Sequence, residues 1–148
     1  MATILLLSGP NLNLLGQRDP DQYGSATLDD LVAVASATAA ALGHTVEHLQ
    51  SNDEAGLIDA IHGARGRCAA IVINAGAFTH YAYALTDALE IFDGPKVEVH
   101  LSNVAAREDW RHRSVVSPVV DGVITGLRAT GYRLAVEAAA ALLEERGA

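Results

Sequence analysis

The sequence contains one cysteine, Cys68, and one lysine, Lys96, among 148 residues. A single thiol cannot form an internal disulfide, and metal sites built on thiolates need several cysteines, so we expect neither. Lys96 begins the strand predicted over residues 96–101, at the end opposite to the one where we expect the ligand site. Schiff-base chemistry, which needs an amine at the reacting carbon, is therefore excluded.

The sequence also lacks long hydrophobic runs and an excess of basic residues. No stretch of eighteen apolar residues is present, and the first residues, MATILLLSGPN, have no basic region typical of a signal peptide. The formal net charge is −8, which disfavours binding to nucleic acid or to an anionic membrane. We expect a cytoplasmic protein with neither of these partners.

The length predicts one domain that spans residues 1–148, and its strands and helices alternate. We expect strands at 3–8, 45–50, 69–73, 96–101 and 123–125. Between them we expect a helix from the N-cap Thr27 to the glycine at 43, then helices over 53–64 (capped by Asn52), 80–92 and 129–145. The last helix is predicted to pack Leu134, Ala138 and Leu142 inward.

Such alternation predicts an α/β fold with a parallel sheet between two helical layers. The strand at 45–50 mixes polar and apolar residues, as an edge strand does. The best match is a flavodoxin-like three-layer sandwich with five parallel strands in the order 2-1-3-4-5.

Polar side chains gather where three of the predicted strands end, which is the edge where parallel sheets bind ligands. They are Asn11, Asn13, Arg18 and Tyr23 after the first strand, Asn74 and His80 after the third, and His100, Ser102, Asn103, Arg107 and Arg111 at and after the fourth. Taken singly, each has an ordinary structural explanation as a turn residue, a cap or a surface ion pair. Taken together, they predict one pocket.

The sequence lacks the motifs typical of serine hydrolases, P-loop proteins, dinucleotide-binding proteins and zincins. We expect no bound metal and no cofactor. Proton transfer remains: guanidinium groups near Tyr23 favour its phenolate, which makes it a base. His100 is the candidate acid, with Glu98 on the same face of the strand to orient it, and Asn11 could stabilise an enolate oxygen. A base and an acid on two loops suggest a dehydration beside a carbonyl.

Six segments carry a resemblance to a known family. They are SGPNLNLLGQRDPDQYG, HLQSN, NAGAFTHYAYALTDAL, VEVHLSN, REDWRHRS and ITGLRATGYRLAV, in this order along the chain. Together they resemble the type II 3-dehydroquinate dehydratases.

This resemblance implies loss of water from 3-dehydroquinate to give 3-dehydroshikimate through an enolate, without a cofactor. It implies Tyr23 as base, Arg18 as the lid residue that activates it, His100 as acid, and Asn11 acting on the enolate through a water. It further implies substrate binding by Asn74, His80, Leu101, Ser102 and Arg111, with Asp87 reaching the site of a neighbouring subunit. A homo-oligomer, a dodecamer built from trimers, is expected.

Two alternatives stay open at this point. The chain could be a non-catalytic flavodoxin-like module that binds a nucleotide or a flavin. The same enzyme could serve quinate breakdown instead of the shikimate pathway of aromatic amino acid biosynthesis.

Overall fold

The computed structural model describes residues 1–147. Five parallel strands form one sheet in the order β2-β1-β3-β4-β5. Their bounds are β1 Thr3–Ser8, β2 Thr45–Gln50, β3 Ala70–Asn74, β4 Lys96–His100 and β5 Gly122–Thr125. The predicted flavodoxin-like strand order is confirmed.

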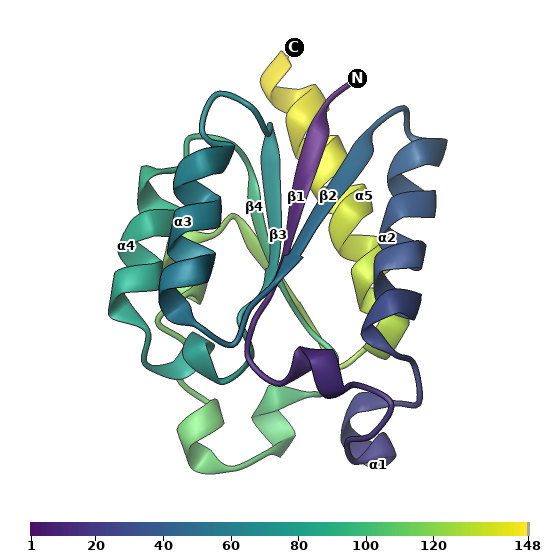
Figure 1. Cartoon of the computed structure of the whole chain (residues 1–148), viewed down its shortest axis with the longest axis vertical. Helices are drawn as coiled ribbons and strands as arrows, with labels where there is room; N and C mark the ends of the chain where they lie inside the picture. Colours follow the sequence, from purple (N-terminus) through teal and green to yellow (C-terminus); the bar gives the residue numbers. More distant parts are fainter. Residues whose placement is uncertain (148) are drawn as a thin grey trace.

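Helices cover both faces of this sheet (Figure 1). Helices α2 (Leu28–Ala41) and α5 (Arg128–Gly147) pack on one face, and α3 (Glu54–Ala64) and α4 (Tyr83–Ile91) pack on the other. The short helix α1 (Pro20–Tyr23) lies at the end of the molecule opposite the two termini. No helix within residues 1–147 has the length and apolar character needed to cross a membrane.

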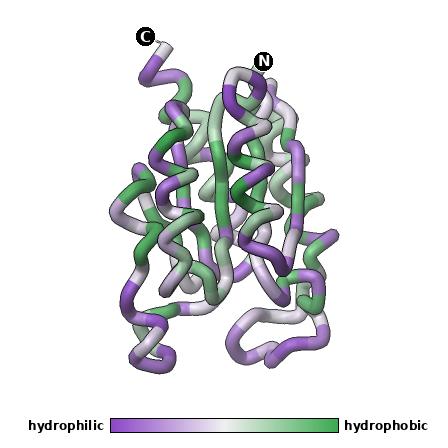
Figure 2. Tube along the Cα trace, turned by 60° about the vertical axis from the view of Figure 1, so that its left-hand side comes forward, coloured by the Kyte–Doolittle hydropathy of each residue, from purple (hydrophilic) through white to green (hydrophobic). Residues whose placement is uncertain are grey.

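Strand β1 explains why both helical layers are needed. Successive side chains of a strand point to opposite faces, so Ile4 and Leu6 pack into the core beneath α2 and α5, whereas Leu5 and Leu7 pack beneath α3 and α4. Each buried leucine stabilises the fold by roughly 1.5–3 kcal/mol. Figure 2 shows the apolar strands in the interior and mostly hydrophilic loops at the lower end of the molecule.

The first residues of helices α2 and α3 show how single side chains determine where a helix begins. Thr27 caps α2 as predicted: its hydroxyl accepts a hydrogen bond from Asp30 N, and the Asp30 carboxylate accepts one from Thr27 N. The predicted cap of α3 was wrong by one residue. Asp53 caps that helix through Ala55 N, because the side chain of Asn52 is bonded instead to the loop after β1.

Helix α4 begins at Tyr83, three residues later than expected, and the 3-10 turn Gly76–His80 precedes it. The carbonyl of Thr79 accepts a hydrogen bond from Val115 N at 2.8 Å and is therefore not free for a helical bond. His80 is thus the last residue of the 3-10 turn and lines the cleft, instead of beginning α4.

The inward face of α5 also differs from the prediction. Tyr132, Ala135, Val136 and Ala139 are fully buried, whereas Leu134 is only half-buried; Ala138 and Leu142 pack at the margin of the core. Alanine surrounds the helix on several sides, so the apolar pattern did not distinguish the two faces.

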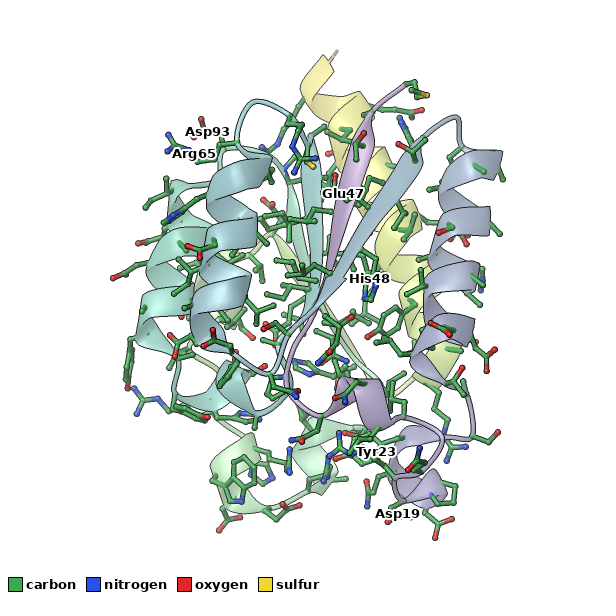
Figure 3. All side chains as sticks on the ribbon, viewed as in Figure 1. Asp19, Tyr23, Glu47, His48, Arg65 and Asp93 are labelled. Carbon is green, nitrogen blue, oxygen red and sulfur yellow. The ribbon has the colours of Figure 1, made fainter. Side chains whose placement is uncertain are left out.

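Cys68 and Lys96 lie at the amino edge of the sheet, away from α1. Burial raises the pKa of the Cys68 thiol and lowers the pKa of Lys96, whose Nζ donates to the carbonyl of Phe92. Figure 3 places Arg65 and Asp93 at this same end of the molecule, and Tyr23 and Asp19 at the other.

Candidate active site

A cleft opens at the carboxyl edge of the sheet, with about 550 Å³ of empty space, open solvent included. It is lined by residues from the loops after β1, β3 and β4: Pro10, Asn11, Leu12, Arg18, Tyr23, Asn74, Gly76, Ala77, His80, His100, Leu101, Ser102, Val104, Arg107 and Arg111. The three strand ends predicted from the sequence therefore meet in one place, although Asn13 and Asn103 do not line it.

Asn11 enters this cleft from a strained turn. Its backbone is left-handed, with φ 67°, a conformation that asparagine tolerates better than most residues. The end of β2 holds the turn. Asn52, just after the strand, accepts from Asn11 N through Oδ1 at 3.0 Å, and Gln50, the last residue of the strand, donates from Nε2 to both Asn52 Oδ1 and the Gly9 carbonyl. The edge strand thus fixes the position of Asn11.

Tyr23 is presented to the cleft by helix α1. Asp19 caps this helix through Asp21 N, and Pro20 at its first position favours the helical backbone. The Tyr23 hydroxyl accepts hydrogen bonds of 2.7 Å from Arg18 Nη2 and from Arg107 Nη1. The Arg18 guanidinium also lies 3.9 Å from the ring centroid. Two cations on one oxygen stabilise negative charge there.

His100 ends strand β4 and is almost fully buried, at 6% exposure. Its Nε2 pairs with Glu98 Oε2, and the other oxygen of Glu98 accepts a 2.7 Å hydrogen bond from Ser117 Oγ. Glu98 does not line the cleft but lies behind His100, as its position two residues earlier on the strand predicts. The carboxylate can therefore orient the imidazole.

Asn74 is held by Tyr132 of α5. Asn74 Nδ2 donates to the Tyr132 hydroxyl at 3.0 Å, and Asn74 Oδ1 accepts from Gly76 N at 3.1 Å. Burial raises the pKa of Tyr132 to about 12, so this hydroxyl stays protonated at all physiological pH values. Asn74 consequently keeps one amide hydrogen and one oxygen lone pair for a ligand.

His80 and Arg111 line a further part of the cleft. His80 Nδ1 lies 2.7 Å from the carbonyl of Arg113, which assigns the proton to Nδ1 and leaves Nε2 as an acceptor. Burial lowers the pKa of His80 and favours this neutral form. Arg111 donates to Glu108 at 3.0 Å and stacks 4.0 Å from the centroid of the Trp110 ring, which fixes its guanidinium at the rim.

Leu101 and Ser102 line the floor beside His100, and Arg107 Nη1 donates to Ser102 Oγ at 3.3 Å. Three predicted site residues lie away from the cleft. Asn13 is exposed, and Asn103 caps the 3-10 turn Val104–Ala106 through Ala105 N. The third is Asp87. It lies exposed on α4 and is not among the residues that line the cleft.

Three supporting residues escaped the sequence analysis or were left without a role. Arg107 was named only among the polar residues predicted at the pocket, without a role, and Tyr132 and Asn52 were not assigned to the site. Tyr132 is the one large polar-tipped residue on an alanine-rich helix face, which is the signal that was available. Asn52 was interpreted as a helix cap.

Fold and cleft together define an α/β protein of flavodoxin-like topology with a polar pocket at the carboxyl edge of its sheet. The model of the family "Dehydroquinase class II" matches residues 2–140. The chain belongs to this class II dehydroquinase family.

Individual relatives agree with this assignment. The chain is 55% identical to "3-dehydroquinate dehydratase 2" of Pseudomonas putida, over 98% of this chain and 97% of that protein. It is 53% identical to "Catabolic 3-dehydroquinase" of Aspergillus clavatus, over 97% and 96% of the two chains. Its structure is similar to the crystal structure of type II dehydroquinase from Propionibacterium acnes, with a TM-score of 0.90, 44% identity, and coverage of 95% and 97%.

Proposed function

We propose that this class II dehydroquinase removes water from 3-dehydroquinate to give 3-dehydroshikimate, with Tyr23 as base and His100 as acid. The observation that carries the assignment is the Tyr23 hydroxyl, which accepts hydrogen bonds from two guanidinium groups in the cleft that His100 also lines. No other tyrosine in residues 1–147 lines this cleft.

In the first step, the Tyr23 phenolate takes a proton from C2 of the substrate, and the electron pair of the C–H bond moves toward the C3 carbonyl. An enolate forms, and Asn11 stabilises its oxygen through a water. Arg18 and Arg107 hold Tyr23 in the reactive form and at the reactive place.

In the second step, the enolate expels the C1 hydroxyl and a C1–C2 double bond forms. His100 gives a proton to the departing oxygen, which leaves as water. Glu98 stabilises the protonated imidazole beforehand, since its carboxylate pairs with His100 Nε2. Proton exchange with solvent then returns Tyr23 and His100 to their starting forms.

Substrate binding is assigned to the remaining walls of the cleft. The Leu101 backbone amide and the Ser102 hydroxyl would bind the substrate carboxylate, and Asn74, His80 and Arg111 would contact the ring hydroxyls. The neutral Nε2 of His80 suits a hydroxyl donor. Asp87, exposed on α4, would reach the site of a neighbouring subunit in a dodecamer built from trimers. A cytoplasmic location is part of the same proposal.

The test is the enone absorbance that appears when purified protein is mixed with 3-dehydroquinate without added metal. Turnover that survives borohydride treatment and disappears in Tyr23→Phe would support an imine-free reaction with Tyr23 as base. A folded protein without turnover would instead favour the flavodoxin-like binding module. The same dehydration would serve aromatic biosynthesis or quinate breakdown, and one relative is named for the catabolic role.

A further inference from the structure

Arg128, at the start of α5, has an unusual backbone conformation. With φ 52°, it is one of two non-glycine residues in the left-handed region within residues 1–147; the other is Asn11. A side chain with a Cβ raises the free energy of this conformation, which glycine adopts without cost. Such strain persists only where the surroundings enforce it, and it often marks a functional position.

The backbone of Arg128 is attached to the acid side of the cleft. Arg128 N donates to the Leu101 carbonyl at 3.1 Å, and two residues earlier Gly126 N donates to the His100 carbonyl at 3.2 Å. The turn before α5 is therefore bonded directly to the end of β4, where the proposed acid lies.

The side chain of Arg128 extends to the base side of the cleft. Its Nη2 donates to the Asp21 carbonyl at 3.1 Å, within helix α1 and two residues before Tyr23. The aliphatic part of the side chain lies against Gly24, where an added Cβ would be 3.3 Å from Arg128 Cδ. The last carbonyls of a helix have no donor within that helix, and Arg128 supplies one to Asp21.

We propose that Arg128 is a positioning residue that ties helix α1 to the end of β4 and so sets the placement of Tyr23 relative to His100. The left-handed backbone aims the side chain at α1, which accounts for the strain. Arg128 does not line the cleft, so it acts through Tyr23 and not on the substrate. The kinetic part of this inference rests on the proposed function.

Three variants separate the effect of the hydrogen bond from Arg128 to the Asp21 carbonyl, called the tether below, from the effect of the strained backbone. Arg128→Met keeps a long aliphatic side chain and the strain but removes the donor, whereas Arg128→Lys keeps a charged donor. Arg128→Gly removes both the tether and the strain. We expect amide hydrogen exchange at Tyr23 and Gly24 to be faster in Arg128→Met and Arg128→Gly than in the wild type, and Arg128→Lys to restore part of the protection.

We further expect kcat to fall about tenfold in Arg128→Met and Arg128→Gly, with KM changed by less than about twofold, because a misplaced base slows the reaction without removing a binding contact. The melting temperature of Arg128→Gly should equal or exceed that of the wild type, since its strain is relieved. A lower kcat in a protein that is no less stable separates positioning from a structural role.

Two results would overturn the proposal: unchanged exchange at Tyr23 and Gly24 in Arg128→Met, or faster exchange together with wild-type kcat in all three variants. Absence of turnover in the wild type would contradict the proposed function and not the tether. The hydrogen-exchange measurement needs no substrate, so it tests whether Arg128 holds helix α1 in place independently of the proposed function.

Discussion

Arg107 and Tyr23 lie 84 positions apart in the sequence, yet Arg107 Nη1 donates a 2.7 Å hydrogen bond to the Tyr23 hydroxyl. Arg18, the second donor, is only five positions from Tyr23. One cation is therefore supplied by the loop that carries the base, and the other arrives only when the loop after β4 has folded. The hydrogen bonding of the Tyr23 hydroxyl therefore depends on the tertiary structure and not on its own loop alone.

Replacing Tyr23 by phenylalanine should lower kcat by about a thousandfold, because general-base catalysis contributes on that order. The enone absorbance measures this directly. Tyr83→Phe is the matched control, since Tyr83 is exposed on α4, and it should retain wild-type activity. A Tyr23→Phe enzyme with more than half of the wild-type rate would exclude Tyr23 as the base.

Replacing Arg18 by alanine should lower kcat by about a hundredfold and change KM by less than about threefold, since its contacts are to Tyr23. Steady-state kinetics at several substrate concentrations separate the two constants. Arg65→Ala makes the same change of charge at the far end of the molecule and should leave both unchanged. A rise in KM with unchanged kcat would mean that Arg18 binds substrate only.

Replacing Glu98 by glutamine keeps the shape of the buried side chain but removes its charge. We expect kcat to fall by about a hundredfold, because the protonated His100 loses its charged partner. Ser117→Ala removes only the hydrogen bond to Glu98 Oε1 and should have a much smaller effect. Equal losses in the two variants would show that orientation, and not charge, is what Glu98 provides.

Replacing Tyr132 by phenylalanine should raise KM severalfold with little change in kcat, because Asn74 loses the hydroxyl that holds its amide. The lost buried hydrogen bond should also reduce the free energy of unfolding by about 1–2 kcal/mol at neutral pH. Chemical denaturation and steady-state kinetics measure the two effects. Unchanged KM would remove Tyr132 from the support of Asn74.

The stability of Tyr132→Phe should also differ in its pH dependence. Burial raises the pKa of Tyr132 from 10.0 to about 12 in the folded protein, so above pH 10 the unfolded chain ionises first. The wild type should lose up to about 3 kcal/mol from this residue as the pH rises from 10 to 12, and the variant should not. The stability advantage of the wild type at neutral pH should therefore shrink above pH 10 and reverse near pH 12, because the expected loss exceeds the initial difference; a constant difference would contradict the raised pKa of Tyr132.

The fold was predictable because buried strands appear in the sequence as continuous runs of apolar residues. Strands β1 and β3 are buried on both faces and appear as continuous apolar runs, and Thr27 with Asp30 marks a helix start. Helix α1 escaped prediction because four residues carry no periodicity. The family assignment from the sequence motifs is confirmed by the family match and the curated relatives.

Most residues of the site were predictable from the sequence, but several of their hydrogen-bond partners were not. Glu98 and His100 share a strand face, and Arg18 and Tyr23 share a loop, so local spacing was enough. The bonds of Asn52 to Asn11 and of Tyr132 to Asn74 join segments 41 and 58 positions apart, and no local pattern encodes them. The roles of individual residues remain predictions until the variants are measured.

The single lysine has a practical consequence. Lys96 is the single lysine of the sequence, and it lies at the amino end of β4, opposite the cleft, so it offers amine-directed dyes and surfaces one side-chain attachment point. Because burial lowers the pKa of Lys96, its amine becomes nucleophilic at a lower pH than an ordinary lysine. Fluorescent or immobilised forms can therefore be prepared with every cationic group around the substrate left chemically intact.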